Sequence, residues 1–150
     1  MLPLGPISKS PINPLLDRLT AVIILACAVG FVMFLANVQP DPRGYGTHEQ
    51  FGMEPCGWVV QYGKPCPTCG VTTAGAHLVR MQLWQAVNAQ PFGTGLGLFG
   101  MWLGAVAAWC LLRARSYGDF LFQLPLGRIV IWGIALLLGS WIYLYLTFAP

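Results

Sequence analysis

The sequence predicts an all-α integral membrane protein with three transmembrane helices. Of its 150 residues, 56% are hydrophobic and only 9% are charged, whereas soluble domains carry roughly 25% charged residues. Three apolar runs, over residues 19–38, 94–112 and 129–148, approach the ~20 residues that a helix needs to cross a bilayer. The chain has too little polar surface for a water-soluble globule, so residues 1–150 are predicted to form a single membrane domain.

The three predicted spans contain no Asp, Glu, Lys, Arg or His. Proton relays, voltage sensors and ion pathways normally place ionisable groups at membrane depth, so the sequence argues against a pump or carrier. The basic residues are scattered along the chain, whereas nucleic-acid binding requires a basic patch or stripe. The expected surroundings are therefore the lipid bilayer and other membrane protein subunits, with no nucleic acid.

The distribution of Lys and Arg predicts the orientation of the chain. Five flank the side that carries the N-terminus, namely Lys9, Arg18, Arg113, Arg115 and Arg128. The opposite side holds Arg43, Lys64 and Arg80. Because cytoplasmic loops are enriched in basic residues, we expect the N-terminus in the cytoplasm. The C-terminus and the long segment between the first two spans would then lie outside it.

Proline and glycine shape the segments outside the spans. Residues 1–18 are rich in proline and predict an extended tail, either a flexible leader or a strap against a partner. The run at 19–38 is longer than the 7–15 apolar residues of a signal peptide, which favours an uncleaved anchor. Turn-forming residues predict a loop over 39–65, and residues 113–128 predict a basic loop.

An amphipathic helix is predicted within residues 66–90, after a Cys-Pro-Thr-Cys-Gly turn. Its apolar face carries Ala76, Val79, Leu83 and Val87, and its polar face carries His77, Arg80 and Asn88. This 3.6-residue periodicity and Trp84 suit a helix at the membrane interface. Pro67 is expected at the first helical position, and Pro91 is expected to end the helix.

Three interpretations of the cysteines near this turn remain open. Cys66 and Cys69 form a Cys-x-x-Cys pair, which suits thiol–disulfide exchange or a structural disulfide. The same pair suits a zinc site, for which Cys56 with His77 or His48 would supply two further ligands. The simplest interpretation is that the cysteines only shape a tight turn. No catalytic residues are identified, and the balance favours a noncatalytic protein.

The second predicted span carries small residues on one helical face. Gly93 and Gly97, then Gly100, Gly104 and Ala108, follow at intervals of four residues. Small residues at this spacing allow two helix backbones to approach closely within a membrane. The glycine face (Gly93, Gly97, Gly100, Gly104 and Ala108) is therefore predicted to pack helices, either within the chain or against another subunit.

The run Cys66-Pro67-Thr68-Cys69-Gly70-Val71-Thr72, followed by an amphipathic helix, resembles an uncharacterised, DUF2752-like family of small bacterial inner-membrane proteins. The resemblance covers about half the chain and implies a location in the bacterial cytoplasmic (inner) membrane. The family's expected signature is Cys-Pro-x-Cys-Gly-x-Thr-Arg, then a Gly-Asp pair. This chain instead has Thr73 in place of the arginine, and Met81 and Gln82 in place of Gly-Asp.

These departures favour a noncatalytic accessory subunit of a larger membrane complex, docked through the glycine face and the proline-rich tail. The alternative is a membrane thiol-disulfide or zinc-binding protein that works through Cys66 and Cys69.

Overall fold

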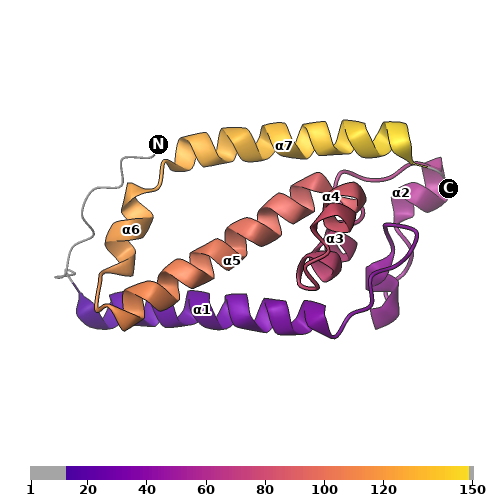
Figure 1. The fold of residues 1–150 in the computed structure, drawn as a ribbon. Coiled ribbons are helices and arrows are strands. Elements are labelled where there is room, and N and C mark those ends of the chain that lie inside the picture. The colour runs from indigo at the N-terminus through magenta and orange to yellow at the C-terminus, as the bar shows by residue number, and fades with distance from the viewer. Residues whose placement is uncertain (1–12, 149–150) are drawn as a thin grey trace. The chain divides into compact units, whose positions relative to one another are not determined.

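A computed structural model describes residues 13–148 of the protein, and this part of the chain is helical, with no strand (Figure 1). The elements in chain order are α1 (Pro14–Ala36), the 3-10 helix η1 (Thr47–Phe51), α2 (Gly57–Tyr62), α3 (Val71–Leu78), α4 (Leu83–Ala89), α5 (Pro91–Leu112), α6 (Tyr117–Gln123) and α7 (Leu126–Thr147). The helices α1, α5 and α7, of 23, 22 and 22 residues, are long and apolar enough to cross a membrane. The predicted fold class is therefore confirmed.

The first of the three long apolar helices begins earlier than the apolar run predicted from the sequence. The extended tail was predicted to reach residue 18, but α1 already begins at Pro14. The Asn13 side chain accepts a hydrogen bond from the Leu16 amide at 3.2 Å, which satisfies a donor that no helical carbonyl can reach. Proline suits the first helical position because its fixed φ matches the helix. The first twelve residues of the predicted tail lie outside the described residues.

The chain divides into two compact units. One contains the chain up to Phe31 together with Phe99–Gly127, and the other contains Val32–Leu98 together with the chain from Arg128 onward. Both α1 and α5 run through the two units, because the boundaries at Phe31 and Phe99 fall inside these helices. The cysteine-bearing segment belongs to the second unit.

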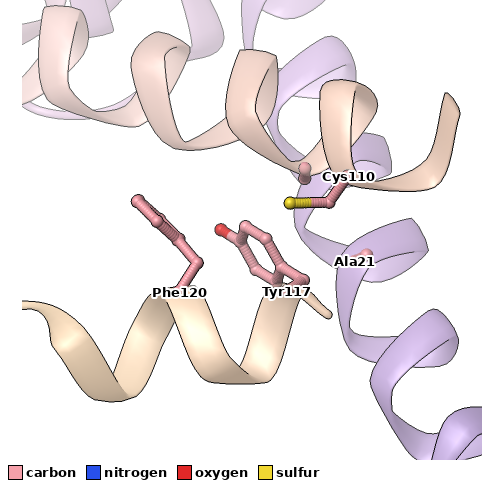
Figure 2. Close-up of a cluster of buried hydrophobic side chains, with 5 residues drawn as sticks. Ala21, Cys110, Tyr117 and Phe120 are labelled. Atoms are coloured by element: carbon pink, nitrogen blue, oxygen red, sulfur yellow. The ribbon is translucent and has the colours of Figure 1, made fainter. Parts of the chain in front are cut away.

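The first unit is built around a buried cluster on α1, α5 and α6 (Figure 2). Its fully buried members are Ala21, Ala107, Cys110, Tyr117 and Phe120. A Cβ added at Gly104 would lie 2.6 Å from the Cβ of Ala28, closer than carbon atoms can approach. Glycine at position 104 therefore permits the close packing of α5 on α1.

The predicted basic loop over residues 113–128 contains the helix α6, so the loop prediction was wrong for this stretch. The Asp17 carboxylate, on α1, accepts hydrogen bonds from the amides of Tyr117 (3.2 Å) and Gly118 (2.6 Å) and from the Ser116 hydroxyl (2.9 Å). The Ser116 hydroxyl in turn accepts from the Asp119 amide at 3.2 Å. The first turn of α6 is therefore stabilised by a residue about a hundred positions away, which local periodicity does not reveal.

The predicted loop over residues 39–65 is also partly helical, since it contains η1 and α2. Both short helices end at a glycine in the left-handed conformation, Gly52 (φ 75°) and Gly63 (φ 63°). The turn-formers therefore mark the ends of helices here, a common use of glycine.

The single amphipathic helix predicted after the cysteine turn is two helices, α3 and α4. The chain breaks at Met81, whose φ is 60°. The amide of Gln82 donates to the carbonyl of His77 at 3.0 Å, and the His77 ring is hydrogen bonded to the Gln82 side chain at 2.7 Å. One helix was predicted because the turn contains neither Gly nor Pro, so the apolar periodicity of the sequence continues across it.

Pro67 and Pro91 both occupy positions that differ from the predicted ones. Pro67 is not the first residue of a helix, because it lies in the turn before α3, which begins at Val71. Pro91 follows the end of α4 at Ala89 and itself begins α5. Proline at the start of a helix loses no helical hydrogen bond, so α5 begins three residues before the predicted span.

The glycine face contacts the chain itself at several positions. An added Cβ would lie 2.9 Å from Val71 Cα at Gly93 and 2.7 Å from Leu78 Cδ2 at Gly97, but would meet nothing within 4 Å at Gly100. Gly93 and Gly97 therefore bring α5 close to α3 in the second unit, as Gly104 brings it close to α1 in the first. Docking of another subunit on this face stays a prediction.

Replacing Asp17 with alanine tests the bond between α1 and α6. Removal of the carboxylate leaves two amides and one hydroxyl without their acceptor, which costs about 1–3 kcal/mol for a buried group. We expect a lower unfolding temperature for the purified protein in detergent. Glu54→Gln removes an exposed carboxylate and should leave the unfolding temperature unchanged. Equal stability of the two variants would contradict the assigned role of Asp17.

Candidate functional site

The Cys66–Cys69 segment is a tight turn that leads into α3. The Cys69 amide donates to the Cys66 carbonyl at 3.1 Å, and the Val71 amide donates to the Thr68 carbonyl at 3.2 Å. Gly70 precedes the helix with φ of 85°, and a Cβ there would lie 2.7 Å from the carbonyl oxygen of Gly44 and 2.8 Å from that of Ala89. Only glycine fits this position, both for its backbone conformation and for space.

The turn brings three cysteine sulfurs together. Cys69 Sγ lies 3.3 Å from the Sγ of Cys66 and 3.3 Å from the Sγ of Cys56, the residue that precedes α2. All three sulfurs lie within 4.8 Å of one another. The structure thus unites three of the four residues predicted as disulfide or metal candidates. None of the three is at disulfide-bonding distance from another.

The two histidines are placed differently. His77, the fourth predicted candidate, forms its 2.7 Å hydrogen bond with Gln82 and is not part of the sulfur cluster. His48 lines a cavity of about 350 Å³ whose walls also include Cys56, Cys66 and Cys69. Of the two histidines considered from the sequence, His48 is therefore the one that shares a cavity with the thiols.

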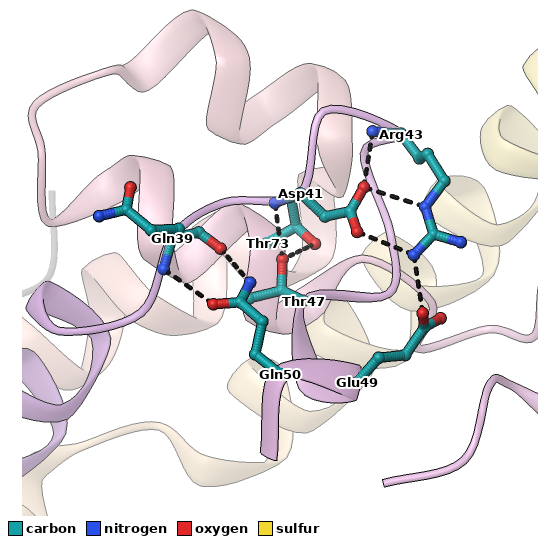
Figure 3. Close-up of polar contacts among 7 residues, drawn as sticks. All are labelled: Gln39, Asp41, Arg43, Thr47, Glu49, Gln50 and Thr73. Atoms are coloured by element: carbon teal, nitrogen blue, oxygen red, sulfur yellow. Dashed lines mark hydrogen bonds and ion pairs between the residues drawn. The ribbon is translucent and has the colours of Figure 1, made fainter. Parts of the chain in front are cut away.

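A polar network holds the segment that contains His48 and η1 (the His48 segment) against α3 (Figure 3). The hydroxyl of Thr47 is 2.7 Å from that of Thr73, and both residues are fully buried. Thr47 also accepts a hydrogen bond from the Asp41 amide at 3.0 Å. The guanidinium of Arg43 contacts the carboxylates of Asp41 and Glu49, each at 2.8 Å. These contacts fix the loop that forms one wall of the cavity.

The ion pairs shift the titration of these groups in the expected directions. The hydrogen bond from Arg43 lowers the pKa of Asp41, because it stabilises the ionised carboxylate. Hydrogen bonds to Asp41 and then Glu49 raise the pKa of Arg43 above its ordinary range. Asp41 and Arg43 therefore both stay ionised at neutral pH.

The thiols of the cluster differ in acidity. Burial raises the pKa of Cys69 above its ordinary range, and its hydrogen bonds with Cys66 and Cys56 act in the same direction. Burial also disfavours the Cys56 thiolate, but hydrogen bonds from the Val59 amide, the Cys69 thiol and the Trp58 amide outweigh it, so the pKa of Cys56 is lowered. Cys56 therefore loses its proton before Cys69 as the pH rises.

The cysteine turn is tied to the helices of its own unit by Gln90. This fully buried amide donates to the Pro67 carbonyl at 2.9 Å. Its oxygen accepts from the Phe92 amide at 2.8 Å and from the Ser140 hydroxyl. The Trp141 indole adds a hydrogen bond to the Pro65 carbonyl at 3.1 Å.

The sequence did not point to Gln90, Ser140, Thr47 or Thr73 as members of the site. The one local signal was a glutamine directly before the proline that begins α5, where a side-chain oxygen can cap the helix.

Comparison with known proteins finds a family to which the part of the chain that contains this site is similar. Residues 56–104 match the family of proteins of unknown function called DUF2752. The DUF2752 region contains Cys56, Cys66 and Cys69 and runs into α5, so the predicted resemblance is confirmed. The expected Cys-Pro-x-Cys-Gly-x-Thr-Arg signature stays a prediction. No curated protein and no solved structure matches the chain.

Within the DUF2752 region, position 73 carries a buried threonine where the resemblance leads us to expect arginine. Its hydroxyl bonds Thr47, so this position links the His48 segment to α3. An arginine in the same buried place would need a partner for its charge.

Valine substitutions at Thr47 and Thr73 test this link. Thr73→Val removes one buried hydrogen bond and should lower the free energy of unfolding by about 1–2 kcal/mol. Thr47→Val should cost more, because it also removes the acceptor of the Asp41 amide. The double variant should cost less than the sum of the two, since both lose the same bond. Thr72→Val, at a neighbouring pocket residue, serves as the control for unfolding followed in detergent, and strict additivity would refute the link.

Proposed function

We propose that this chain is a noncatalytic bacterial inner-membrane protein whose cysteine-bearing segment holds a zinc ion. The observation that carries the proposal is the convergence of Cys56, Cys66 and Cys69, whose sulfurs lie within 4.8 Å of one another. Thiolates are soft ligands that suit zinc. The cluster lies in the segment that the positive-inside rule assigns to the outside of the cytoplasm.

The sulfur positions fit a metal better than they fit a disulfide. In a tetrahedral zinc site with Zn–S bonds of about 2.3 Å, neighbouring sulfurs are about 3.8 Å apart. The 3.3 Å separations of Cys69 from its two neighbours need only a small outward shift. A disulfide, in contrast, uses two sulfurs about 2.05 Å apart and leaves the third cysteine unused.

His48 is the proposed fourth ligand. It lines the same cavity as the three cysteines, and an imidazole completes a Cys₃His set typical of structural zinc sites. The imidazole of His48 is not among the ligand atoms that already lie within 4.8 Å of one another, so the proposal requires its side chain to move toward the three sulfurs when zinc binds. A site with four protein ligands has no open position for substrate, which agrees with a noncatalytic role.

Zinc would cross-link two segments that are separate in the sequence. It would join the residue that precedes α2 to the turn that precedes α3. We further propose that this rigid segment belongs to an accessory subunit of a larger membrane complex. Its support is the predominance of apolar, uncharged surface on the three long helices.

Metal analysis of the purified, full-length protein tests the zinc site. We expect about one zinc ion per chain, as for a Cys₃His structural site. Cys56→Ser, Cys66→Ser and Cys69→Ser should each lose most of the metal. Cys27→Ser, which changes an exposed cysteine on α1, should retain it.

The variant His48→Ala should bind zinc more weakly than the wild type, whereas His77→Ala should not. Thiol trapping with and without reductant completes the experiment. A protein that is free of metal and has two of the three cysteines oxidised would overturn the zinc site in favour of a redox or structural disulfide.

The accessory role is tested by purification from the native membrane in mild detergent. We expect stoichiometric co-purification of at least one other membrane protein. A Gly100→Leu variant fills the position that has no neighbour within 4 Å in this chain and should reduce that co-purification without unfolding the protein. A monodisperse particle of this chain alone would contradict the accessory role and would leave the zinc site standing.

A further inference from the structure

The turn after α3 and the start of α4 together expose three large apolar side chains. Met81, Leu83 and Trp84 are 88%, 51% and 74% exposed. We infer that this apolar turn (Met81–Trp84) inserts into the surface of the lipid bilayer that α1 crosses. The inference concerns an interaction surface apart from the zinc site and is independent of metal binding.

The apolar turn is anchored where α1 ends. The guanidinium of Arg80, the residue before the turn, donates to the carbonyls of Leu35 (3.2 Å) and Ala36 (3.0 Å). These are the last two residues of α1, whose final carbonyls have no partner within the helix. The end of a spanning helix lies at the boundary of the hydrocarbon, so Arg80 holds the turn at that boundary.

A second contact supports the same placement. A Cβ added at Gly75 would lie 2.8 Å from Leu35 Cδ1, so α3 packs closely on the last turn of α1. Met33 and Phe34, in that last turn, are themselves exposed apolar residues. Exposed apolar side chains are therefore present both on the apolar turn and on the end of α1 to which α3 is attached.

The backbone of the turn suits a medium that offers few hydrogen-bond partners. The amides of Arg80 and Gln82 both donate to the His77 carbonyl at 3.0 Å, and the Met81 amide donates to the Leu78 carbonyl at 3.0 Å. These three internal hydrogen bonds reduce the number of amides that would be unpaired when the turn enters an apolar medium. Residues 81–89 also contain no charged side chain.

The residue types in the apolar turn also support its insertion into the bilayer surface. Met81 has a φ of 60°, a conformation that glycine adopts without strain but that a long side chain adopts only at a cost. The chain nevertheless presents a flexible apolar side chain there, almost fully exposed. Beside it lies Trp84, a residue type enriched at the membrane–water interface.

Tryptophan fluorescence of the full chain in phosphatidylcholine vesicles tests the inference. The contribution of Trp84 is obtained as the difference between the wild-type protein and Trp84→Phe. We expect this difference emission to be blue-shifted and to lose most of its intensity when lipids brominated near the headgroup are used. The matched control is Trp132→Phe, which removes an equally exposed indole, 74%, from within α7. Its difference emission should be quenched more by bromines deeper in the acyl chains.

Two results would overturn the inference. One is a red-shifted Trp84 emission that aqueous iodide quenches and brominated lipids do not, since the turn would then face water. The other is a blue-shifted emission that neither quencher reduces, since a protein would then cover the turn. Folding of Trp84→Phe is checked by its unfolding temperature, which should match that of the wild type.

Discussion

The buried amide of Gln90 is the constraint on which the second unit depends. A primary amide can donate two and accept two hydrogen bonds, and burial makes each unmade bond costly. Gln90 donates to Pro67 in the cysteine turn and accepts from the first turn of α5 and from Ser140 of α7. One side chain thus sets the position of the Cys66–Cys69 turn relative to two of the long helices of its unit.

Polar side chains satisfy the ends of other helices in the chain as well. Asp17 stabilises the first turn of α6, and Arg80 binds the last carbonyls of α1. In each case a polar side chain satisfies backbone groups at the end of a helix, where no carbonyl or amide of the same helix is available. Glycine performs the complementary task, since Gly97 and Gly104 let α5 approach its neighbours closely. Polar side chains at helix ends and small residues on helix faces therefore hold the helices together, which in a soluble protein is mainly the task of a large apolar core.

The cysteine site shows where prediction from sequence succeeded and where it stopped. The Cys66–Cys69 pair was recognisable because its spacing is local, and Cys56 was a candidate because it lies in the same polar segment. The choice between His48 and His77 could not be made, because it depends on the Thr47–Thr73 contact across 26 residues. The prediction of a single amphipathic helix within residues 66–90 was wrong at Met81 for a similar reason: the turn there is stabilised by hydrogen bonds that apolar periodicity does not encode.

Hydrophobic length and short spacings are properties of neighbouring residues, so the helical class, the three long apolar helices and the local cysteine turn could all be predicted from the sequence. Three features became visible only in the folded chain: Cys56 joins the Cys66–Cys69 pair, His48 rather than His77 shares their cavity, and α6 forms within an expected loop. Each of these depends on side chains such as Asp17, Thr73 and Gln90 that satisfy distant backbone or side-chain groups. Such pairings minimise unpaired polar groups over the whole fold, so no single stretch of the chain specifies them.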